Sequence, residues 1–169
     1  NSLVGEFVAI VSPKSQTTRE NIVGVYNDKS TQIVFIDTPG FHKPHNTLGE
    51  NMMKAVGAGL SDVDAAVFMI EAVTRFKFDP DNLPPAEIKL MDEIKKRNIP
   101  AILAVNKIDL LEDKGELLPI INAYCSQLPF AAVVPFSAKS GDGVEILINE
   151  LMPFCKESVH YFDSDTVTD

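Results

Sequence analysis

The chain has 169 residues, a length that suits one domain with a buried hydrophobic core. Hydrophobic residues make up 45% of it and charged residues 23%, which excludes wholesale disorder, and no apolar run approaches the ~20 residues of a membrane span. The net charge is −9 and Lys and Arg do not cluster, so the chain lacks the basic surface typical of a nucleic-acid binder. Two cysteines without a CxxC pair fit a reduced cytoplasm.

The acidic excess is confined to the second part of the chain. Residues 1–60 carry five basic and five acidic residues, so residues 61–169 account for the whole net charge of −9. Solvated acidic helix faces explain this distribution, and so does a first part that tolerates an anionic ligand. Both interpretations stay open.

Short apolar runs alternate with segments of helical length. The two runs at 22–26 and 32–36 flank a polar turn and predict an antiparallel hairpin. In the helix predicted over 144–152, we expect Ile146, Leu147 and Leu151 to face inward. The other predicted strands are 7–11, 65–70, 102–105 and 133–136, and the other predicted helices are 48–60, 86–97 and 116–128. Such alternation indicates a parallel α/β sheet, whose ligand site lies beyond the carboxyl ends of its strands.

The segment Asp37-Thr38-Pro39-Gly40 follows the run that ends at Ile36. An Asp at a strand end can hold a hydrated Mg²⁺, and a Gly three residues later lets a backbone N–H approach a phosphate closely. The same four residues also make an ordinary turn. Taken alone, they favour the turn.

The segment Asn106-Lys107-Ile108-Asp109 follows the strand predicted at 102–105. A carboxylate here can accept hydrogen bonds from the N1–H and the 2-amino group of guanine, a pair of donors that adenine lacks. A site built in this way rejects the wrong base strongly, because its own polar groups would be left unpaired.

The segment Ser137-Ala138-Lys139 follows the last predicted strand, and a small residue here lets a backbone N–H reach the guanine carbonyl. This tripeptide alone is a weak signal. The three segments together, each at a strand end, predict a guanine-nucleotide site.

These motifs resemble those of the translation-factor-related GTPases and, more closely, of the Era family of bacterial GTPases. Residues 11–19 look like the first switch of that family, with Gln16-Thr17-Thr18-Arg19 as its signature, and residues 41–44 and 48–50 look like its second switch. The resemblance implies an α/β P-loop NTPase-like three-layer sandwich, with a mostly parallel sheet and one antiparallel edge strand.

The resemblance also implies a role for each matching residue. Thr18 would ligate Mg²⁺ and close over the γ-phosphate of GTP, Asp37 would bind Mg²⁺ through water, and Gly40 would offer its N–H to the γ-phosphate. Thr18 and Gly40 are thus the implied catalytic residues, and Thr18 and Asp37 the implied metal ligands. Thr38 and Pro39 complete the phosphate-side set.

On the base side, the resemblance assigns Asp109 to reading guanine, with Asn106 bracing the site and Lys107 lying along the ring. Ala138 would meet the guanine carbonyl. Ser137 and Lys139 complete the implied nucleotide-binding set.

The sequence departs from the wider class at two places. None of the nine glycines is followed by Lys, so the chain holds no G-x-x-x-x-G-K-[ST] phosphate loop, and residues 1–6 look like the end of the helix after it. We therefore expect either that the first strand and the phosphate loop precede Asn1 or that the missing strand comes from elsewhere. Phe41 stands where many GTPases carry a water-orienting Gln, which implies slow intrinsic hydrolysis.

The resemblance implies a GTP-hydrolysing switch over residues 1–158, incomplete at its N-terminal end, and a linker over 159–169 toward an RNA-binding KH domain. Its implied partners are GTP, GDP and, through that further domain, 16S rRNA in small-subunit assembly. The implied location is the cytoplasm, with peripheral association at the inner face of the plasma membrane. The alternatives are a non-catalytic guanine-nucleotide-binding or interaction module and a related GTPase of ribosomes or tRNA modification.

Overall fold

A computed structural model describes residues 23–28, 30–36, 63–72, 79 and 81–159. The chain divides into two compact units, one of residues 1–62 and 155–169 and the other of residues 63–154. The strand predicted at 7–11 and the helix predicted at 48–60 lie outside the described residues.

The described part of the first unit is a hairpin of strands β1 (Val23–Asp28) and β2 (Thr31–Ile36). The strands are antiparallel, with Val23 opposite Ile36 and Asp28 opposite Thr31. The predicted hairpin is confirmed, and its strands run closer to the turn than the apolar pattern alone indicates. Its place at the edge of a larger sheet stays a prediction.

The second unit is built on a parallel sheet in the order β3-β4-β5, from strands Ala66–Glu71, Ala101–Asn106 and Ala132–Pro135. The central strand β4 is buried from Ala101 to Val105, as expected of a parallel strand covered on both faces. The register pairs Glu71 with Asn106, so β3 and β4 end side by side. The predicted parallel α/β fold is confirmed.

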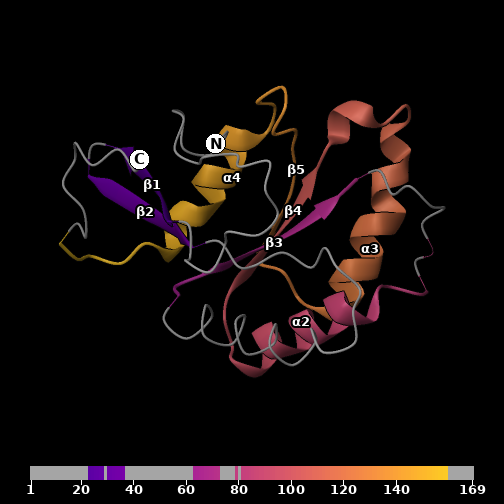
Figure 1. Ribbon diagram of the computed structural model, residues 1–169, viewed down its shortest axis with the longest axis horizontal. Helices are drawn as coiled ribbons and strands as arrows, with labels where there is room; N and C mark the ends of the chain where they lie inside the picture. The colour runs from indigo at the N-terminus through magenta and orange to yellow at the C-terminus, as the bar shows by residue number, and fades with distance from the viewer. Residues whose placement is uncertain (1–22, 29, 37–62, 73–78, 80, 160–169) are drawn as a thin grey trace, which may run out of the picture. The chain divides into compact units, whose positions relative to one another are not determined.

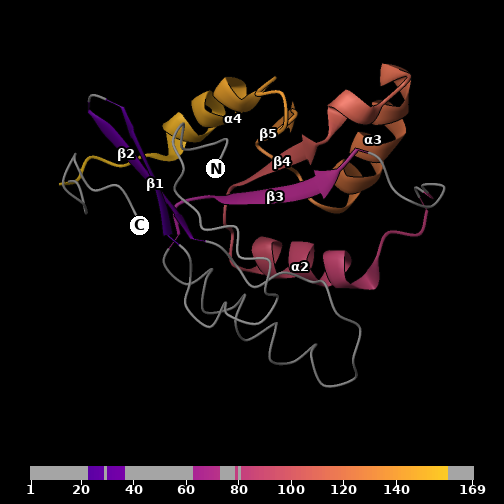
Figure 2. The same ribbon diagram turned by 45° about the horizontal axis from the view of Figure 1, so that its top comes forward.

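Among the described residues, three α-helices cover this sheet: α2 (Pro85–Lys96), α3 (Leu117–Gln127) and α4 (Val144–Leu151). Figure 2 shows α4 on one face of the sheet and α2 on the other. On the α2 side, the Tyr124 ring of α3 packs against Phe68 of β3, with ring centroids 6.0 Å apart, and its hydroxyl donates to Glu87 of α2 at 2.6 Å. This unit therefore has the helix–sheet–helix layers that the sequence predicts (Figure 1).

The helix predictions need one correction. Ile146 was expected to face inward, but it is 56% exposed, and Ile148 is buried with Leu147 and Leu151 instead. At 100° per residue, Ile146 lies roughly opposite the centre of that buried stripe. In the described ranges, no helix is long and apolar enough to cross a bilayer.

Candidate functional site

The candidate site lies where β4 and β5 end. Asn106 is the last residue of β4, and the Ser137 loop begins just beyond β5. The Phe136 N–H donates to the Val105 carbonyl at 2.8 Å, and the Ile108 N–H donates to the Phe136 carbonyl at 3.4 Å. The two loops therefore leave the sheet tied to each other at the edge where α/β proteins hold ligands.

Asn106 connects the two loops through its side chain. Its Oδ1 accepts hydrogen bonds from the Lys107 N–H at 2.7 Å and from the Ala138 N–H at 3.0 Å. The first bond holds Lys107 in a left-handed conformation, with φ 67° and ψ 32°. That conformation costs a residue other than glycine about 1–2 kcal/mol, and it persists where the surroundings enforce it. Asn106 has the geometry that a bracing role requires.

A serine orients the Asp109 carboxylate. The fully buried Ser137 donates its hydroxyl to Asp109 Oδ1 at 2.6 Å, and its Oγ accepts from the Ser140 N–H at 3.2 Å. Asp109 itself is exposed, in the short helix η1 (Ile108–Leu110). Because the buried Ser137 hydroxyl holds one of its oxygens, the Asp109 carboxylate is already oriented to accept hydrogen bonds from a ligand.

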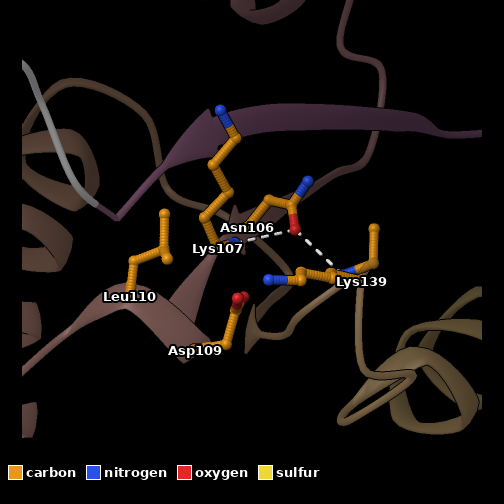
Figure 3. Close-up of a pocket in the computed structure, with 6 residues that line it drawn as sticks. Asn106, Lys107, Asp109, Leu110 and Lys139 are labelled. Atoms are coloured by element: carbon orange, nitrogen blue, oxygen red, sulfur yellow. Dashed lines mark hydrogen bonds between the residues drawn. The ribbon is translucent and has the colours of Figure 1, made fainter.

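These residues surround a pocket of about 280 Å³. This volume lies near the lower end of the ~300–1,000 Å³ that is usual for small-molecule pockets. Figure 3 shows the Lys107 side chain rising toward β3, while that of Lys139 reaches across the pocket toward Asp109. The lining residues are Asn106, Lys107, Asp109, Leu110, Ala138 and Lys139.

One implied contact differs from the structure. The resemblance assigns the Ala138 N–H to the guanine carbonyl, whereas here that N–H donates to Asn106. A bound base would share it in a three-centre hydrogen bond or displace the Asn106 oxygen, because a single N–H has one proton to donate.

The predicted site residues on the phosphate side lie outside the described residues, namely Thr18 and Asp37 to Gly40. Within the ranges that the structure describes, no three or more His, Cys, Asp or Glu side chains gather into a metal site. The structure thus brings together the base-side half of the predicted residues.

Two residues at or near the pocket were not predicted from the sequence. Leu110 lines the pocket and is exposed, and it directly follows the Asn106–Asp109 motif. Glu71 ends β3 and forms an ion pair with Lys107, with 2.5 Å between Oε1 and Nζ. Glu71 could have been predicted from its position at the end of a strand, because the three sequence motifs also follow strand ends.

Residues 1–107 match the protein family described as 50S ribosome-binding GTPase. The chain belongs to this GTPase family. Its curated relatives include the GTPase Era of Clostridioides difficile strain 630, at 40% identity over all 169 residues, and the GTPase Era of Ruminiclostridium cellulolyticum, at 36%. The chain covers 54% of each of these two relatives, so it spans about half of their length.

Solved structures agree with this family. A variant of Aquifex aeolicus Era bound to GDP·AlF4⁻ is 32% identical, with a TM-score of 0.79 over all of this chain and 56% of that one. The elongation factor SelB of Methanococcus maripaludis, in complex with GppNHp, covers 84% of this chain and 30% of its own, at 20% identity and a TM-score of 0.61. The SelB likeness supports the fold alone. The expected resemblance to Era-family GTPases is confirmed.

Proposed function

We propose that this chain is the guanine-nucleotide-binding part of a GTP-hydrolysing switch. The observation that carries the proposal is the Asp109 carboxylate, which lines the pocket and accepts a hydrogen bond from the buried Ser137 hydroxyl. Membership of a GTPase family and the nucleotide bound to the Aquifex aeolicus relative support the same ligand.

Base selection would follow from donor and acceptor chemistry. The carboxylate of Asp109 would accept from the N1–H and the 2-amino group of guanine. Adenine presents no such pair, so the Asp109 carboxylate would gain no ligand donors from it. Leu110 and the methylene groups of Lys107 supply apolar surface for the flat faces of the ring.

The phosphate side of the proposal rests on the resemblance. Thr18 and Asp37 would hold Mg²⁺, and Gly40 would donate its N–H to the γ-phosphate. Mg²⁺ suits such a site because it prefers oxygen ligands and keeps several waters. When bound, the ion would neutralise charge on the phosphates during phosphoryl transfer to water.

The biological setting is proposed on the same basis. The Era relatives suggest a role in assembly of the small ribosomal subunit, with 16S rRNA bound through a KH domain beyond this chain. Cytoplasmic location and peripheral membrane association belong to the same proposal. Because the matched family is that of 50S ribosome-binding GTPases, a GTPase that acts on the large ribosomal subunit is the second candidate. Co-sedimentation of the full-length protein with separated small and large subunits distinguishes the two.

The direct test is a thermal-shift titration of the full-length protein with Mg²⁺ and GTP, GDP or ATP. Because ligands that bind only the folded state stabilise it, we expect GTP and GDP, but not ATP, to raise the Tm. An equal response to ATP, or no response, would contradict the proposal. Phosphate release from GTP then separates an active switch from a binding module without catalysis.

A further inference from the structure

Glu71 and Lys107 face each other across the ends of β3 and β4. Glu71 pairs with Asn106 in the sheet register, and the Ala72 N–H donates to the Asn106 carbonyl at 2.7 Å. Lys107 follows directly, and its ammonium lies 2.5 Å from the Glu71 carboxylate. Sheet hydrogen bonds therefore hold the backbone at Glu71 and at Asn106, the residue before Lys107.

The left-handed backbone of Lys107 gives this ion pair its direction. With φ 67° and its N–H held by Asn106, Lys107 sends its side chain toward the end of β3 (Figure 3). The ammonium pairs with Glu71 while the stem of Lys107 lines the pocket. Long cationic side chains commonly bury an apolar stem while the charged head stays in water or on a partner.

The pair is too exposed to serve mainly as a stabilising contact. The side chains of Lys107 and Glu71 are 44% and 58% exposed, and ion pairs at such positions add little to folding stability. A restrained Lys107 matters more for a ligand, because a lysine that is free to rotate loses rotamer entropy when a ring packs on it.

We propose that Glu71 is a positioning residue of the nucleotide site: it holds Lys107 extended, so that the lysine stem is a preformed wall for the guanine ring. The proposal rests on the proposed nucleotide-binding function. It adds a residue from β3, a strand that supplies none of the three motifs. The carboxylate also offsets one of the two lysine charges that line the pocket.

A double-mutant cycle on GDP release tests this role. Release of a fluorescent GDP analogue is measured for the wild type, Glu71→Gln, Lys107→Met and the double variant. We expect Glu71→Gln to speed release by roughly three- to tenfold, the scale of one immobilised side chain. In the Lys107→Met background the same change should have no further effect.

Three further measurements separate positioning from a general structural or electrostatic effect. Glu112→Gln makes the same charge change at an exposed residue outside the pocket lining, and it should leave release unchanged. High salt should raise the rate of GDP release from the wild type toward that of Glu71→Gln, because salt screens the ion pair between Glu71 and Lys107. Glu71→Asp should restore most of the slow release, and equal Tm values should show that all variants fold.

Each outcome is decisive. A Glu71→Gln variant that matches the wild type, releases GDP more slowly, or keeps its effect without Lys107 overturns the positioning role alone. A wild type that binds no guanine nucleotide overturns the proposed function and this inference with it.

Discussion

Two glycines in the loop after Ser137 give a matched pair for testing how the site is supported. Gly141 and Gly143 both have positive φ, 83° and 76°. A Cβ at Gly141 would meet nothing within 4 Å, whereas at Gly143 it would lie 2.6 Å from the Pro135 carbonyl oxygen and 2.9 Å from Phe136 Cβ. Phe136 is only 1% exposed and has no open space to enter.

The expected magnitudes follow from that difference. Gly141→Ala carries only the strain of a left-handed alanine, about 1–2 kcal/mol. Gly143→Ala carries the same strain plus the overpacking of β5, typically about 1–3 kcal/mol, so we expect a total near 2–5 kcal/mol. Because Pro135 and Phe136 lead into Ser137 and Ala138, Gly143→Ala should also weaken GDP binding more than Gly141→Ala does.

Equilibrium urea unfolding measures the stability difference. Far-UV circular dichroism is the suitable probe, since the chain has no Trp. Similar losses of unfolding free energy in the two variants, or a larger loss in Gly141→Ala, would refute the claim that a side chain at position 143 clashes with Pro135 and Phe136.

Two more substitutions test single hydrogen-bonded side chains. Asn106→Ala removes the acceptor of two backbone N–H groups, so we expect the free energy of unfolding in urea to fall by about 2–3 kcal/mol and GDP binding to weaken. The control Asn122→Ala, at an exposed position on α3, should change neither quantity. Equal effects of the two substitutions would contradict the bracing role of Asn106. Burial and the Glu87 carboxylate raise the pKa of the Tyr124 phenol above its ordinary 10.0, so above that pH the unfolded chain has lost a proton that the folded chain keeps. As the pH rises above 10, the free energy of unfolding of the wild type should therefore fall by about 1.4 kcal/mol per pH unit more than that of Tyr124→Phe. Urea unfolding at several pH values measures this, and parallel curves for the two proteins would contradict this account.

The fold was predictable where local pattern and burial agree. The apolar run 102–105 indicated a strand of a parallel sheet, and the polar turn between the runs 22–26 and 32–36 indicated a hairpin. The helix at 144–151 was harder because four of its residues are large and apolar, so composition alone does not say which of them face the sheet. The stripe of Leu147, Ile148 and Leu151 obeys helical periodicity, and Ile146 does not.

The base-side residues were predictable because parallel strands bring their carboxyl ends to one edge. The contacts behind them were not. A glutamate that ends a strand usually extends into solvent, and the pairing of Glu71 with Lys107 depends on the left-handed backbone of the lysine. Sequence reasoning finds such a conformation mainly through Gly or Asn, and Lys gives no such signal.

The central claim is that Asp109 reads guanine, and exchanging the base tests it most directly. Asp109→Asn replaces a charged acceptor by an amide that can donate to the 2-oxygen of xanthine. We expect GDP affinity to fall by at least ~2 kcal/mol, about thirtyfold, and xanthosine diphosphate to become the preferred ligand, while exposed Asp92→Asn on α2 binds GDP like the wild type. Unchanged GDP affinity in Asp109→Asn, with no gain for the xanthine nucleotide, would contradict the account.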